Sequence, residues 1–134
     1  MKIKNLLKLA SRKAKISMIP VDVISARLIV DPLEGKEEKV AIVDSPHYKH
    51  LLGEREPYRE YYERIVLATH KKRKHAPEAF DELASKFSFL RSLLIVVTSD
   101  DIGGFIIHDG LHRCALYKYH GIRKVPCLVL RRDP

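Results

Sequence analysis

Residues 105–116, with the sequence FIIHDGLHRCAL, are the stretch that decides the fold. The apolar residues Phe105 to Ile107 predict a short strand, and the pair Asp109-Gly110 predicts the turn that ends it. From Leu111 onward the apolar residues recur at helical spacing, until a glycine at position 121 marks the place where a helix would stop. The stretch therefore predicts a strand, a tight turn and a helix.

The first turn of this predicted helix carries His112 and Arg113. The amino end of a helix has unpaired N–H groups and the positive end of the dipole, so it favours an anion over a cation. An anionic ligand, most simply a phosphate, would explain the two side chains. Two ordinary explanations stay open beside it: Arg113 is solvated, or His112 bridges to Asp109 as a cap.

Composition points to one globular domain with one core, because the chain has 134 residues of which 46% are hydrophobic. No apolar run approaches the roughly 18 residues that a membrane span needs, and residues 1–10 lack the continuous apolar core of a signal peptide. Two cysteines are too few for a disulfide scaffold, so we expect a cytoplasmic protein. Cys114 is either a thiol with a lowered pKa or a small buried residue.

The net charge of +8 is concentrated in two places. Residues 1–15 hold six basic residues and no acidic one, and Lys71 to Lys74 adds four more. The remaining chain has 15 basic against 17 acidic residues. We therefore expect a basic tail or short amphipathic helix and one basic loop, which permit contact with nucleic acid or with an acidic membrane surface.

The rest of the chain alternates short strands and helices, which predicts a small mixed α/β (α+β) domain. Residues 19–30 predict one bent strand or two strands broken at Ser25 and Ala26, and residues 33–39 predict a polar loop. The other predicted elements are strands at 40–43, 93–98 and 125–130, and helices at 46–52, at 56–69 and from 77 onward.

Residues 104–130 resemble the ParB/sulfiredoxin-like superfamily. The pattern D-G-x-H-R stands at Asp109 to Arg113, and G-I-x-x-V-P stands at Gly121 to Pro126. The resemblance implies a ParB/sulfiredoxin-like domain over residues 16–134, with a short mixed sheet and a helical insertion at about residues 44–91.

Members of this superfamily share a nucleotide-phosphate site at the helix but use it differently. Leu111 stands where sulfiredoxins carry their reactive cysteine, and the single Arg113 stands where chromosome-partitioning ParB proteins carry two arginines. The motif is most similar to the ParB-like free serine kinases. The resemblance thus implies a phosphotransferase that moves a nucleotide phosphoryl group to a small hydroxyl-bearing metabolite.

This resemblance implies ATP or another nucleotide with Mg²⁺, bound by Gly110, Leu111, His112 and Arg113. His112 would bind the transferred phosphoryl group, and Asp109 would hold Mg²⁺ or orient His112.

The acceptor would need a base and a pocket. Glu34 is the first candidate for the base and Asp31 the second, and His47, Tyr48 and Arg55 would line the pocket. The alternative is a nucleotide-gated DNA- or RNA-binding module, or a nuclease-like ParB domain without kinase activity. Such a module would contact nucleic acid through Lys71 to Lys74 and the basic tail. A member that has kept the fold and lost activity is the third interpretation.

Overall fold

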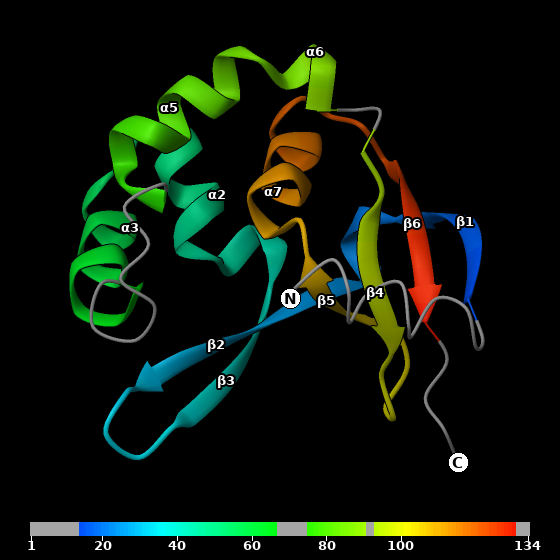
Figure 1. Cartoon of the computed structure of the whole chain (residues 1–134), viewed down its shortest axis with the longest axis horizontal. Coiled ribbons are helices and arrows are strands. Elements are labelled where there is room, and N and C mark those ends of the chain that lie inside the picture. Colours follow the sequence, from blue (N-terminus) through cyan, green and yellow to red (C-terminus); the bar gives the residue numbers. More distant parts are fainter. Residues whose placement is uncertain (1–13, 67–74, 91–92, 131–134) are drawn as a thin grey trace.

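The computed structural model describes residues 14–66, 75–90 and 93–130. Its centre is a six-stranded mixed sheet with helices packed against one face (Figure 1). The strands are β1 (Ala14–Pro20), β2 (Ile24–Asp31), β3 (Lys36–Ala41), β4 (Ile95–Ser99), β5 (Phe105–Asp109) and β6 (Lys124–Leu130). Their order across the sheet is β1-β6-β4-β5-β2-β3, with parallel pairing between β6 and β4 and between β5 and β2. The predicted mixed α/β fold is confirmed.

The helical segments are η1 (Val21–Val23), η2 (Ile42–Asp44), α2 (Pro46–Leu51), α3 (Glu56–Tyr61), η3 (Tyr62–Val66), α5 (Pro77–Ser85), α6 (Phe87–Leu90) and α7 (Leu111–Tyr119). Most of them lie between β3 and β4, in the region where a helical insertion was predicted. In the ranges that the structure describes, no helix is long and apolar enough to cross a membrane.

Helix α7 lies at the centre of the hydrophobic core. Its residues 114–117 are buried, and they pack with the inward-facing side chains of β4 and β6, which alternate along each strand. These strand residues are Ile95, Val97, Val125, Cys127 and Val129. The strand, turn and helix predicted from residues 105–116 are therefore present, and they hold the core together.

The break between the first two strands was predicted at the wrong place. β1 ends at Pro20, which has no N–H to donate, and the next N–H, that of Val21, donates to the carbonyl of Arg123 at 2.8 Å. β2 then continues without a break at Ser25 and Ala26, and the Ala26 side chain faces inward and is buried.

The polar loop predicted at residues 33–39 is also wrong in its second half. β3 begins at Lys36 and pairs antiparallel with β2, with Leu28 opposite Glu38. Backbone pairing does not need apolar side chains, and charged side chains suit an edge strand because they discourage pairing with other molecules. The strand predicted at residues 40–43 correspondingly ends at Ala41.

Parts of three predictions lie outside the described residues. Residues 1–13 of the predicted tail are among these, whereas Ala14 and Lys15 begin β1. The basic loop at Lys71 to Lys74 is another, and the helix predicted at 56–69 is described only as far as Val66.

Candidate functional site

The turn between β5 and α7 is formed by Gly110, whose φ of 104° is a conformation that glycine adopts readily. A Cβ atom at this position would lie 3.0 Å from the Arg113 Nη2 atom, so a side chain here would also crowd the Arg113 guanidinium. Among the described residues, no side chain caps the amino end of α7. The first backbone N–H of the helix with a helical hydrogen bond is that of Cys114, which donates to the Gly110 carbonyl at 2.8 Å. The first turn therefore has backbone N–H groups that the described side chains leave uncapped.

Arg113 is held in place by two acceptors. Its Nη1 atom donates to the Leu94 carbonyl at 3.0 Å, and its Nη2 atom donates to the Asp109 carboxylate at 3.3 Å. The Arg113 side chain is 13% exposed, whereas that of Asp109 is 53% exposed. Arg113 is therefore not a solvated side chain, and the bridge to Asp109 that was considered for His112 is made by Arg113.

His112 takes part in a hydrogen-bond chain that fixes its tautomer. Its Nε2 atom lies 2.8 Å from the Tyr58 hydroxyl oxygen, and the Tyr58 hydroxyl donates its hydrogen to the His75 carbonyl. Tyrosine has one hydroxyl hydrogen, so the Tyr58 oxygen must accept from a protonated Nε2. The Nδ1 atom of His112 then carries a lone pair and is an acceptor.

Burial lowers the pKa of His112 to about 3, with smaller contributions from the nearby His75, His50 and Arg113. His112 is therefore neutral at pH 7 and is not the cation that its place in the sequence suggested.

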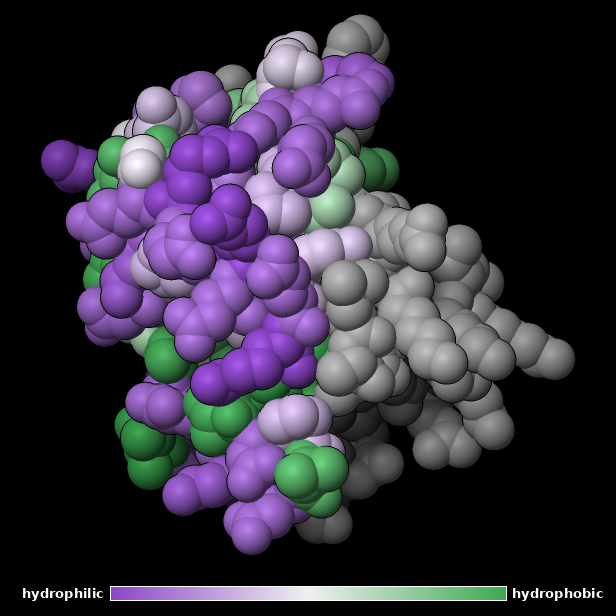
Figure 2. Space-filling model, turned by 90° about the vertical axis from the view of Figure 1, so that its left-hand side faces the viewer, coloured by the Kyte–Doolittle hydropathy of each residue, from purple (hydrophilic) through white to green (hydrophobic). Residues whose placement is uncertain are grey.

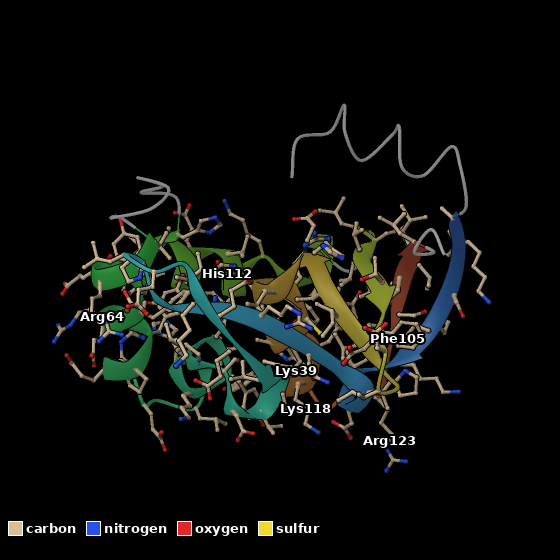
Figure 3. All side chains as sticks on the ribbon, turned by 90° about the horizontal axis from the view of Figure 1, so that it is seen from below. Lys39, Arg64, Phe105, His112, Lys118 and Arg123 are labelled. Atoms are coloured by element: carbon tan, nitrogen blue, oxygen red, sulfur yellow. The ribbon has the colours of Figure 1, made fainter. Side chains whose placement is uncertain are left out.

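Aromatic side chains from three helices surround His112. The ring centroid of His112 lies 4.6 Å from that of His47 on α2, 5.8 Å from Tyr58 on α3 and 4.8 Å from Phe80 on α5. The His75 ring stacks on it at 4.7 Å. Figure 3 shows His112 well separated from Lys118, which lies at the opposite end of α7. The amino end of α7 thus faces a cluster of phenol, phenyl and imidazole rings.

Two further imidazoles of this cluster are buried on α2. His47 and His50 are each 2% exposed, and in the described part of the chain the Nδ1 atom of each has no hydrogen-bond partner. Burial, followed by the charges of neighbouring histidines, lowers the pKa of His47 well below its usual value. The Nε2 atom of His50 lies 2.8 Å from the Asp81 carboxylate. His47 is thus placed by ring packing, whereas His50 is placed by packing and by its contact with Asp81.

Of the three residues predicted for the acceptor pocket, the structure brings His47 to His112. Arg55 instead makes a two-pronged contact with the Asp81 carboxylate at 2.6 and 3.1 Å on an exposed side of α3. Tyr48 is half-buried against the core, and its N–H is bonded to the Ser45 hydroxyl that caps α2. The helix predicted at residues 46–52 thus begins at Pro46, with Ser45 as its cap.

The two candidates for the base lie at the end of the β2–β3 hairpin, Asp31 as the last residue of β2 and Glu34 in the turn that follows. The Asp31 carboxylate accepts the N–H groups of Leu33 and Glu34 at 3.0 and 3.4 Å, an arrangement typical of a turn. Glu34 is exposed in the same turn. Figure 1 shows this turn at the tip of the hairpin, away from α7, so neither carboxylate is brought to His112.

The described residues contain no group of three or more His, Cys, Asp or Glu side chains that could hold a metal ion. Asp109 would therefore need the oxygens of a ligand to complete a Mg²⁺ site.

Cys114 is buried, and burial raises the pKa of its thiol to about 12. It is a small buried residue, and the alternative of a thiol with a lowered pKa is wrong.

Sequence reasoning missed Tyr58, His75 and Phe80 as neighbours of His112. Tyr58 and His112 are 54 positions apart, and no local pattern joins them.

Comparison of the chain with protein-family models, with curated proteins and with solved structures found no match.

Proposed function

We propose that the amino end of α7 binds the phosphates of a nucleotide, and that the protein is a phosphotransferase acting on a small hydroxyl-bearing molecule. The observation that supports this proposal is the first turn of α7, which follows Gly110 and has no side-chain cap from the part of the chain that the structure describes. Free N–H groups and the positive end of the helix dipole make such a turn favourable for a phosphate. The resemblance of Asp109 to Arg113 to ParB/sulfiredoxin-like nucleotide sites supports the same assignment.

Arg113 would contact a phosphate oxygen through its Nη2 atom. Its Nη1 atom stays on the Leu94 carbonyl, so the guanidinium is already fixed before the ligand arrives. Asp109 now neutralises Nη2, and its negative charge would repel a phosphate. Asp109 would hold a Mg²⁺ ion, whose charge would offset this repulsion, so the proposal requires binding that depends on Mg²⁺.

His112 would orient the acceptor. Its Nδ1 lone pair accepts a hydrogen bond from the acceptor hydroxyl, while the chain through Tyr58 keeps the ring in that tautomer. A pKa of about 3 makes His112 a weak base. Catalysis of phosphoryl transfer depends mainly on positioning the reacting groups and on stabilising the charge of the transition state, so a weak base suffices. In this scheme His112 takes the place that was predicted for Glu34 or Asp31.

The test is calorimetry with ATP, ADP and CTP, each with and without Mg²⁺, on the wild type and on Asp109→Asn. We expect Mg²⁺-nucleotide to bind the wild type, and Asp109→Asn to weaken that binding about tenfold, which corresponds to about 1.4 kcal/mol. Without Mg²⁺ the same variant should bind more tightly than the wild type. Asp22→Asn is the matched control, because Asp22 pairs with Lys118 at the other end of α7.

Absence of binding by all three nucleotides would overturn the proposal, as would equal effects of Asp109→Asn and Asp22→Asn. With the preferred nucleotide known, formation of the nucleotide with one phosphoryl group fewer, together with the phosphorylated alcohol, on addition of serine or another small alcohol tests the transfer itself.

A second proposal, binding of DNA or RNA, is favoured by one observation. His75, which directly follows Lys71 to Lys74 in the sequence, stacks on His112. The phosphates of a nucleic acid would then use the same turn of α7. Binding to a single-stranded oligonucleotide that falls steeply with salt would support this proposal, and weak binding that salt does not change would contradict it.

A further inference from the structure

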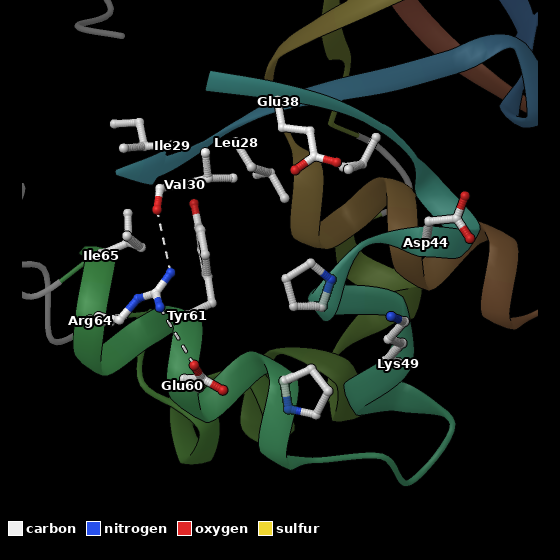
Figure 4. A pocket seen from close by; sticks show the side chains of 13 residues that line it. Leu28, Ile29, Val30, Glu38, Asp44, Lys49, Glu60, Tyr61, Arg64 and Ile65 are labelled. Atoms are coloured by element: carbon white, nitrogen blue, oxygen red, sulfur yellow. Dashed lines mark hydrogen bonds and ion pairs between the residues drawn. The ribbon is translucent and has the colours of Figure 1, made fainter. Parts of the chain in front are cut away.

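A second candidate site lies where α2 and α3 face the β2–β3 hairpin, and it does not depend on the proposed phosphate site. A cavity of about 350 Å³ opens between the β2–β3 hairpin and the helices α2, α3 and η3 (Figure 4). Its volume is at the lower end of the range for small-molecule sites. Neither His112 nor Arg113 lines it.

The walls of this cavity are apolar and rigid. Leu28 and Val40 line it from the two strands, the rings of Pro46 and Pro57 line it from the first turns of α2 and α3, and Tyr61 adds an aromatic ring. Figure 2 views the molecule from this side and shows apolar side chains gathered below a largely hydrophilic surface. Such walls exclude water from the apolar part of a ligand.

The charged residues at the cavity do not balance. The Arg64 guanidinium forms an ion pair with Glu60 at 3.7 Å and donates a hydrogen bond to the carbonyl of Val30 at 3.3 Å. Asp44, Lys49 and Glu38 add two negative charges and one positive charge, so the lining has an excess of one negative charge. In the described part of the chain, none of these three side chains has a hydrogen bond or ion pair, and Glu38 is the one that lies on the strand wall of the cavity.

Glu38 is directed at the cavity by the register of the hairpin. It lies opposite Leu28, a cavity residue, and successive side chains of a strand point to opposite faces. Figure 4 shows the Glu38 carboxylate turned into the cavity across from Tyr61. An unpaired carboxylate above apolar walls is suited to a cation that carries an apolar body.

We propose that this cavity binds a small primary amine with an aromatic or aliphatic body. The ammonium group donates to the Glu38 carboxylate, and the body packs against Tyr61 and the proline rings. The Tyr61 ring also attracts a cation that lies over its face. An acid of the same size would meet the unpaired Glu38 carboxylate and be repelled.

The probe is phenethylamine, compared with its neutral analogue 2-phenylethanol and its acidic analogue 3-phenylpropanoate. Titrations followed by ¹H–¹⁵N NMR should show binding of the amine with shifts at Val40 and Tyr61, weaker binding of the alcohol and none of the acid. Glu38→Gln should weaken amine binding about tenfold, the size expected for loss of a charge-assisted hydrogen bond.

Glu37→Gln is the matched control. It removes the same charge from the neighbouring residue of β3, whose side chain points to the opposite face, so amine binding should not change. Both residues are exposed, so both variants should fold, which thermal unfolding verifies. The proposal is overturned if millimolar amine does not bind, if the acid binds as well as the amine, or if the two variants weaken binding equally. Calorimetry with Mg²⁺-ATP separates this outcome from a failure of the phosphate site.

Discussion

Replacing Tyr58 with phenylalanine removes the hydroxyl that joins α3 to α7. Tyr58 is fully buried, and its oxygen contacts both the His112 Nε2 atom and the His75 carbonyl. Phenylalanine keeps the ring, so the packing is preserved while two polar groups lose their partner. An unpaired buried polar group costs roughly 1–3 kcal/mol. Because His112 and His75 are only half-buried, water compensates in part, and we expect the free energy of unfolding to fall by about 2 kcal/mol in total.

Urea unfolding of Tyr58→Phe and Tyr119→Phe measures this cost. Tyr119→Phe removes the same atom from a side chain that is 47% exposed, so it should cost less than about 0.5 kcal/mol. The dependence of the free energy on urea should stay the same in both variants, since neither changes the surface exposed on unfolding. Equal costs for the two variants would refute the claim that the Tyr58 hydroxyl holds the site together.

The same hydrogen bond can be read directly from the imidazole of His112. Long-range ¹H–¹⁵N NMR distinguishes a protonated ring nitrogen from one with a lone pair. We expect the Nε2-protonated tautomer in the wild type, and a mixture of tautomers in Tyr58→Phe. A wild-type ring protonated at Nδ1 would show that Tyr58 donates to His112, and it would remove the acceptor that the proposed mechanism uses.

Three further predictions concern stability. Because burial lowers the pKa of His112 from 6.5 to about 3 and also lowers that of His47, the unfolded chain binds more protons below pH 6.5. Unfolding free energies should therefore be constant above pH 6.5 and fall toward acid by up to about 1.4 kcal/mol per pH unit for each histidine, and a flat profile from pH 7 to 5 would contradict this. Gly104→Ala should destabilise far more than Gly53→Ala in thermal unfolding, because both have positive φ but only the first would place a Cβ atom 2.7 Å from a backbone carbonyl oxygen. Asp81→Ala should cost about 1–2 kcal/mol and Asp81→Asn less, because asparagine keeps an acceptor for the buried imidazole beside it; equal costs in urea unfolding would contradict that role.

The β5–α7 unit could be predicted because all of its signals are local. An apolar run, an Asp109-Gly110 pair and helical spacing follow one another within 12 residues. The helix start at Ser45 is local in the same way, since the cap and the N–H that it accepts are three positions apart. β3 could not be predicted from its own residues, because Glu37 and Glu38 become a strand only through pairing with β2.

The role of Arg113 shows where sequence reasoning stops at the site itself. A cation in the first turn of a helix suggested a missing anion. In the structure Arg113 pairs through Nη2 with the carboxylate of Asp109, four positions earlier. Its Nη1 atom donates to the carbonyl of Leu94, 19 positions earlier. The first partner could have been found from the spacing, but the second depends on how β4 lies beside α7. The proposed phosphate therefore rests on the uncapped N–H groups of the turn, and no longer on an unexplained cation.

Helices α2, α3 and α5 give the amino end of α7 its chemical character. α2 contributes His47, α3 contributes Tyr58 and α5 contributes Phe80, and these three side chains make His112 a neutral ring with a fixed tautomer. α2 and α3 also line the amine cavity, through Pro46, Pro57 and Tyr61. The ring centroids of His47 and Tyr61 are 5.5 Å apart, so His47 contacts a residue of each site. An amine that shifts the Tyr61 ring would also shift His47, which lies beside His112. Thermodynamic linkage then requires that the amine and the nucleotide change each other's affinity by the same factor. Calorimetric titration of Mg²⁺-ATP with and without saturating phenethylamine measures that factor, and a factor of one would show that the contact through His47 is packing alone.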